Sequence, residues 1–145
     1  MRIACSFLSM LLFAANVPAQ SRLTIDKVNR GEIKAAVQEV AFSSVLEGTV
    51  DDPNLAVYVM VQDPAAKSWR SHRATVAIQN PDVAGRYKWY AICHFGKLDG
   101  RGVGSSYQVR AIAVDSKKAA QVQSSGSPAA GTLQSQTLTF KRVKK

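Results

Sequence analysis

Apolar residues alternate with polar ones along several stretches of this chain, and this alternation constrains the fold more than any other feature. In residues 55–61, four aliphatic residues fall on one face, and Tyr58 and Met60 fall on the other. The same period of two marks residues 74–79, 87–95, 107–113 and 138–140. Side chains on a β-strand point alternately to its two faces, so this pattern predicts half-buried strands.

Clusters of Asp, Asn, Pro and Gly separate these segments: Asp51–Asn54, Asp63–Pro64, Asn80–Asp82 and Asp99–Gly100. Asp caps its own backbone in turns, which explains these carboxylates, and a catalytic or calcium-binding role would need two or more of them to converge. No helix-length segment separates the strands, so a parallel βαβ arrangement is disfavoured. The sequence predicts an all-β fold: a single antiparallel β-sandwich of about seven strands within residues 41–145.

Two segments are less clear. Residues 41–50 alternate and are expected to form a strand, but the apolar positions of residues 32–40 follow helical spacing. The N-terminal region, residues 20–40, therefore contains a strand and a segment that is either a short helix or an edge strand. Residues 117–136 are rich in Ser, Ala, Gln and Gly, which predicts a long loop or a linker before the last strand.

Residues 1–19 have the layout of a secretory signal peptide. Arg2 precedes an uncharged, mostly apolar stretch, and Val17 and Ala19 occupy the small-residue positions of a cleavage site. The stretch is shorter than the roughly 20 residues that a membrane span needs. We expect a mature protein that starts at Gln20, has no transmembrane segment and is secreted or periplasmic.

Cysteine usage refines this location. Cys5 lies in the predicted leader, so Cys93 is the one cysteine of residues 20–145 and no internal disulfide is possible. Small secreted domains of animals usually contain several disulfides. A bacterial periplasm or cell surface is therefore favoured.

The stretch from Tyr90 to Asp115 places a cysteine beside a histidine and then three glycines at alternate positions. A phosphate-binding loop requires a helix directly after it, but here a strand follows, so the glycines are expected to connect two strands. Cys93 and His94 are adjacent on a strand and must diverge, which makes Cys93 a core thiol. The chain has no metal-ligand spacing and no hydrolase motif, so no metal, cofactor or catalytic residue is predicted.

The order Asp99-Gly100, small residues, and then Tyr107-x-Val109-x-Ala111 is similar to the tyrosine corner of immunoglobulin-like sandwiches. With Trp89 one strand earlier, the chain resembles small bacterial secreted or surface Ig-like (fibronectin type III-like) β-sandwich modules. The resemblance implies structural roles for Trp89, Cys93 and Tyr107, with the Tyr107 hydroxyl bonded to the backbone of the preceding loop. The Cys…Trp…Cys pattern of antibody domains is missing. Fold does not imply function here.

Charge is distributed unevenly. Residues 20–66 contain four Lys or Arg and seven Asp or Glu, whereas residues 67–145 contain fourteen and three. The candidate binding segment is Lys67–Arg73, which lacks strand alternation and places Lys67, Arg70, His72 and Arg73 around Trp69. Cations around an exposed indole suit anionic polymers. The alternative is that Trp69 covers one end of the sandwich and its neighbours are solvated.

These features predict an exported, non-catalytic Ig-like module of the bacterial envelope, with a binding or structural role. Its expected partners are anionic polysaccharide, a cell-wall polymer or a lipid surface, contacted through Lys67–Arg73 and the basic residues 141–145. An exported location disfavours nucleic acid. The alternative function is an accessory or catalytic subunit of a glycan or ester hydrolase.

Overall fold

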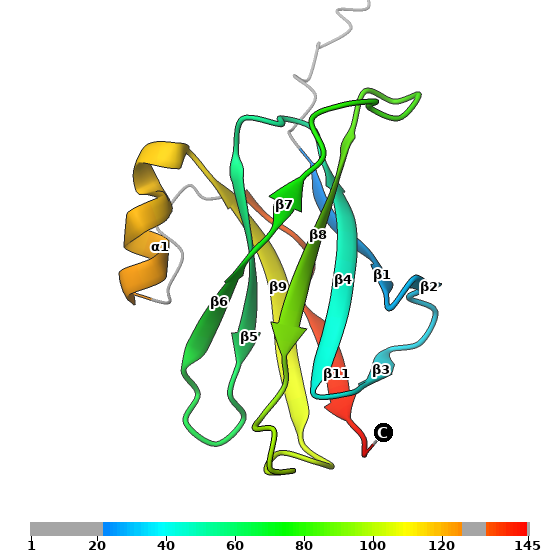
Figure 1. The fold of residues 1–145 in the computed structure, drawn as a ribbon, viewed down its shortest axis with the longest axis vertical. Helices are drawn as coiled ribbons and strands as arrows, with labels where there is room; N and C mark the ends of the chain where they lie inside the picture. Colours follow the sequence, from blue (N-terminus) through cyan, green and yellow to red (C-terminus); the bar gives the residue numbers. More distant parts are fainter. Residues whose placement is uncertain (1–21, 126–132, 145) are drawn as a thin grey trace, which may run out of the picture.

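A computed structural model describes residues 22–125 and 133–144 of the protein. Its strands form two sheets packed face to face (Figure 1). The first sheet has the order β2-β1-β4-β8-β7. Its members are β1 (Leu23–Val28), β2 (Gly31–Glu32), β4 (Ser43–Val50), β7 (Thr75–Val76) and β8 (Tyr87–His94). The predicted leader, residues 1–19, lies outside the described residues.

The second sheet has the order β3-β11-β9-β5-β6, and β10 also pairs with β9. Its members are β3 (Val37–Val40), β5 (Ala56–Gln62), β6 (Trp69–Arg73), β9 (Ser106–Val114), β10 (Leu133–Gln134) and β11 (Leu138–Arg142). The predicted all-β sandwich is thus confirmed. Seven strands have five or more residues, namely β1, β4, β5, β6, β8, β9 and β11.

One edge departs from the expected antiparallel pairing. The chain crosses from the first sheet to the second after β2, and β3 pairs in parallel with β11. Within residues 32–40 the structure therefore has strand residues and no helix. Val40 is fully buried between the sheets, and its carbonyl accepts a hydrogen bond from the N–H of Val143. These tertiary contacts outweigh the helical spacing of the apolar residues.

The first core lies between the two sheets. Alternate residues of β4, β5, β8 and β9 point into it, among them Trp89, Cys93 and Val109, which are at most 1 % exposed. Burial raises the pKa of the Cys93 thiol to about 12. Trp89 packs over Gly48 of β4, where a Cβ would collide with the indole ring and with the Thr24 carbonyl oxygen. A glycine is therefore required opposite the largest core side chain.

A second core covers the outer face of the second sheet. Tyr58, Met60, Ile112 and Val114 are buried there, so β5 and β9 are buried on both faces. The 3-10 helix η1 (Ser116–Lys118) leads into α1 (Ala119–Ser125), whose Val122 completes this cluster. The predicted loop over 117–136 thus contains a helix at its start, and β10 near its end pairs with β9. Residues 126–132 of that segment lie outside the described residues.

Two neighbouring segments also differ from expectation. The strand predicted at residues 74–79 is limited to Thr75–Val76, and Ile78 is 66 % exposed. The chain leaves the sheet before Asn80, which has a φ of 58°, and Pro81, which has no N–H for a ladder bond. Conversely, the segment predicted to lack strand structure forms β6, which pairs with β5 over five residues. β6 is thus an edge strand of the second sheet.

A candidate anion-binding site at one end of the sandwich

The predicted binding segment is divided between the two faces of β6. Trp69 and Arg73 lie opposite Gln62 and Tyr58 and share the outer face of the sheet. There Trp69 packs on the second core beneath Arg110, whose guanidinium carbon is 4.4 Å from the ring centroid. Neither sequence-based interpretation of Trp69, as an exposed stacking platform or as a cover over the end of the sandwich, describes this packing.

Arg70 and His72 lie on the inner side of β6, opposite Val61 and Val59. The backbone N–H of His94 donates to His72 Nε2 at 3.3 Å, which links β6 to β8 of the other sheet. Burial, and then the neighbouring His94, lower the pKa of His72. This imidazole connects the sheets and is turned away from the outer-face cations.

Cationic side chains from distant parts of the sequence gather at one end of the sandwich. The turn after β5 (residues 63–68), the loop after β8 (residues 95–105) and the end of β11 all lie there, at the lower end in Figure 1. We call this region the basic end. Its exposed cations are Lys67, Arg70, Lys97, Arg101, Lys141 and Lys144. Its acidic residues are Asp63, Asp99 and the exposed Glu39 of β3, which lies opposite Lys141.

A cleft of about 220 Å³ opens between the turn and the loop of the basic end. Its polar lining comprises Asp63, Arg70, Lys97, Arg101, Ser105 and Tyr107. Lys67 stands on the adjoining turn, and its N–H donates to the Asp63 carbonyl. The structure thus brings two residues of the predicted segment, Lys67 and Arg70, together with Lys97 and Arg101, which lie outside that segment.

The glycine-rich loop has the role expected from its sequence. Gly96, Gly100, Gly102 and Gly104 have φ values of 77°, 93°, 95° and 84°, which favour glycine. Successive turns are closed by Gly100 N–H to the Lys97 carbonyl and by Ser105 N–H to the Gly102 carbonyl. The loop leads into β9, a strand.

Buried Arg142 fastens this loop. Its Nη1 donates to the Arg101 carbonyl at 2.7 Å, and its own carbonyl accepts from Gly104 N–H at 2.8 Å. The guanidinium also lies over Phe42, with its carbon 5.3 Å from the ring centroid. Arg142 therefore holds the loop in place, and its own side chain is buried.

The Tyr107 hydroxyl packs directly against Gly96 and Gly102, where a Cβ on either glycine would collide with it. Among the described residues it forms no hydrogen bond, so the backbone bond implied by the tyrosine-corner resemblance is not observed. Burial, followed by the nearby Asp63 carboxylate, raises the pKa of Tyr107. The ring contributes to the loop by packing.

Two acidic groups of the basic end, Asp63 and Asp99, are held by their own turns. Asp63 Oδ1 accepts from the N–H groups of Ala65 and Ala66, which lower its pKa, and Oδ2 is 3.9 Å from Arg70 Nη2. Hydrogen bonds from Arg101 lower the pKa of Asp99 to about 2. Within the described chain, Lys67, Lys97, Lys141 and Lys144 form no ion pair, which leaves the end strongly positive.

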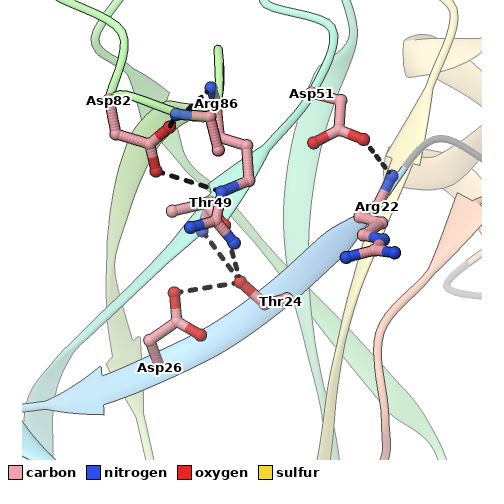
Figure 2. A network of polar contacts seen from close by, with 8 residues as sticks. Arg22, Thr24, Asp26, Thr49, Asp51, Asp82 and Arg86 are labelled. Carbon is pink, nitrogen blue, oxygen red and sulfur yellow. Dashed lines mark hydrogen bonds and ion pairs between the residues drawn. The ribbon is translucent and has the colours of Figure 1, made fainter.

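Other turn carboxylates also accept hydrogen bonds from backbone N–H groups, as turn chemistry predicts. Asp51 accepts from the N–H of Arg22, and Asp82 binds both the backbone and the guanidinium of Arg86 (Figure 2). Figure 2 also shows Thr24, whose hydroxyl lies between Asp26 and Thr49 on the first sheet.

A possible acid, Asp63, and a possible base, His94, line one cavity of about 10 Å³ together with Tyr107. Such a cavity has room for about one water molecule. It is far smaller than a site for a glycan or an ester.

A second hollow, of about 310 Å³, lies on the first sheet and is lined in part by Asp26, Glu47, Lys27, Lys88 and Tyr90. Its acidic and basic side chains balance, so it offers an anion less attraction than the basic end. Within residues 22–125 and 133–144, no helix is long and apolar enough to cross a membrane, and no three His, Cys, Asp or Glu residues are grouped for a metal ion.

Comparison with known proteins does not assign the chain to a family. No protein-family model matches the sequence, and no curated protein is significantly similar to it.

Proposed function

We propose that this protein is an exported, non-catalytic Ig-like module of the bacterial envelope that binds anionic polymers or surfaces through its basic end. The gathering of Lys67, Arg70, Lys97 and Arg101 around one cleft carries the proposal. Clustered cations with few acidic neighbours attract polyanions and accelerate their association.

The strand order supports the Ig-like part of the proposal. In Ig sandwiches, a sheet of strands A, B, E and D packs on a sheet that contains G, F and C. In sheet order, β1, β4, β8 and β7 correspond to A, B, E and D, while β11, β9, β5 and β6 correspond to G, F, C and C′. Tyr107 lies at the start of the strand that corresponds to F, where the tyrosine corner occurs.

The sequence of the leader supports export. A single positive charge, a short apolar stretch and a small-residue cleavage site occupy residues 1–19. The free, buried Cys93 suits an envelope protein that is stabilised by its core rather than by disulfides. Intact-mass spectrometry of the protein from the envelope fraction should give a chain that starts at Gln20. A mass that retains Met1 or Arg2 contradicts this part of the proposal.

Retention on a sulfated-polysaccharide column tests the binding function. The triple variant Lys67→Gln, Lys97→Gln, Lys144→Gln removes three unpaired cations of the basic end. The control, Lys34→Gln, Lys117→Gln, Lys118→Gln, removes the same charge from exposed positions elsewhere. The first variant should elute at much lower salt than the control, because local contacts rather than net charge hold the polymer. Equal elution of the two variants refutes the basic end as the binding surface.

A further inference from the structure

Two aliphatic side chains project from the loop of the basic end. Leu98 is 81 % exposed and Val103 is 43 % exposed. Leu98 lies inside the turn closed between Lys97 and Gly100, and Val103 lies inside the turn closed between Gly102 and Ser105. The loop therefore presents apolar tips directly beside Lys97 and Arg101.

This combination differs from that at the opposite end of the sandwich. Ile78 and Val83 are also exposed there, at 66 % and 109 %. Their loop contains the paired Asp82 and Arg86 and lacks an excess of cations. Of the two ends of the sandwich, as far as the structure describes them, only the basic end combines apolar tips with unpaired positive charge.

The chemistry of the tips favours one class of anionic partner. Sugar rings can stack on exposed aromatic side chains, but the aromatic rings near this end are occupied. Trp69 packs beneath Arg110, Phe42 stacks on His94 at 5.0 Å, and Tyr107 is 3 % exposed. Leu98 lies between Lys97 and the Asp99–Arg101 ion pair. Aliphatic tips beside cations suit a bilayer, in which apolar side chains enter the head-group boundary and cations remain at the phosphates.

The loop is also pre-organised for docking. Arg142 Nη1 fixes the Arg101 carbonyl, and Lys97 N–H donates to that same carbonyl at 2.9 Å. A loop that is ordered before binding loses less conformational entropy when it docks.

We propose that the basic end docks on a bilayer that contains anionic phospholipid. Leu98 and Val103 enter between the head groups, and Lys67, Lys97, Arg101 and Lys144 lie at the level of the phosphates. This inference rests on the proposed function and narrows its partner to a lipid surface.

Vesicle flotation separates this inference from the proposed function. The protein that starts at Gln20, which contains every described residue, is mixed with vesicles of phosphatidylcholine, with or without phosphatidylglycerol. The test variant is Leu98→Ser, Val103→Ser, and its matched control is Ile78→Ser, Val83→Ser at the opposite end. Circular dichroism and thermal melting verify that both variants fold.

The wild-type protein and the Ile78→Ser, Val83→Ser control should float with the anionic vesicles and not with the neutral ones. The Leu98→Ser, Val103→Ser variant should lose about ten-fold or more in partitioning, because two aliphatic side chains no longer leave water. Its retention on the sulfated-polysaccharide column should be unchanged. If it floats like the wild type while the lysine triple variant does not, the contact is purely electrostatic and the lipid inference is wrong, although the proposed function stands.

If the wild-type protein is retained on the column but does not float with any vesicles, the lipid surface is excluded and an anionic glycan is favoured. If the wild-type protein is neither retained on the column nor floats with the anionic vesicles, the proposed function itself is overturned.

A spectroscopic readout tests insertion directly. With Leu98→Trp, the new indole should show blue-shifted fluorescence and protection from an aqueous quencher on anionic vesicles only. Unchanged emission contradicts insertion of the tip.

Discussion

At the scale of single residues, His72 connects the two sheets through a neutral imidazole. Its Nε2 accepts the N–H of His94. Burial, then His94, and more weakly Arg70 disfavour the charged ring and outweigh a backbone interaction with Val59 that favours it, so the folded-state pKa lies below the ordinary value of 6.5. The unfolded chain therefore binds more protons than the folded one in this range.

We predict that stability falls as the pH drops through 6.5 towards the lower folded-state pKa of His72. The melting temperature should decrease between about pH 7.5 and about pH 5.5. The His72→Gln variant keeps an acceptor for His94 N–H but does not titrate, so its melting temperature should depend less on pH. The same pH dependence in both proteins would assign the effect to other groups.

Gly48 is a second position where one residue determines packing. Gly48→Ala places a methyl group against the Trp89 ring and the Thr24 carbonyl oxygen, and backbone on a central strand cannot easily move away. We predict a loss of about 3 kcal/mol or more in the free energy of unfolding, measured by urea denaturation. Gly31→Ala is the matched control, because its nearest atom would be 3.4 Å away. It should change stability by less than about 0.5 kcal/mol.

At the scale of elements, the long strands are predictable because at least one face of each lies in a core. In β4, β8 and β9, burial alternates along most of the strand, so the sequence itself carries the period of two. β6 has no such signal. It pairs on one side only, and its inner positions are Arg70 and His72, so a basic segment forms a strand through the hydrogen bonds of β5.

The short helix α1 was not predicted because, like β6, it lacks a local sequence signal. Val122 is its one large aliphatic residue, and the apolar surface that it covers is supplied by β5 and β9, far away in sequence. Tertiary packing of this kind stabilises helices that are too short to form alone.

We predict that Val122→Ser destabilises the protein by about 2 kcal/mol, because it leaves a void over Ile112 and Met60 and buries a hydroxyl. Ala120→Ser introduces the same side chain at an exposed position of the same helix and should have little effect. Urea denaturation of both variants provides the comparison. Equal stabilities would mean that α1 contributes nothing to the second core.

At the scale of the whole molecule, the candidate site depends on where the sandwich places its loops. The excess of Lys and Arg from residue 67 onwards is visible in the sequence, but the place where these residues gather in the structure is not. Arg70 and Lys97 line one cleft because the start of β6 and the loop after β8 lie at the same end of the two sheets. Sequence proximity groups Arg70 with Arg73 instead, and the alternation of β6 places their side chains on opposite faces.

The central claim is that an anionic ligand contacts the basic end, and NMR titration tests it most directly. Amide shifts of ¹⁵N-labelled protein are followed as a short sulfated oligosaccharide is added. We predict that the perturbed amides cluster in residues 63–68, 96–105 and 141–144, and that the shifts disappear in the Lys67→Gln, Lys97→Gln, Lys144→Gln variant. Perturbations centred on the outer face of the first sheet, around Lys88 and Tyr90, would contradict the account.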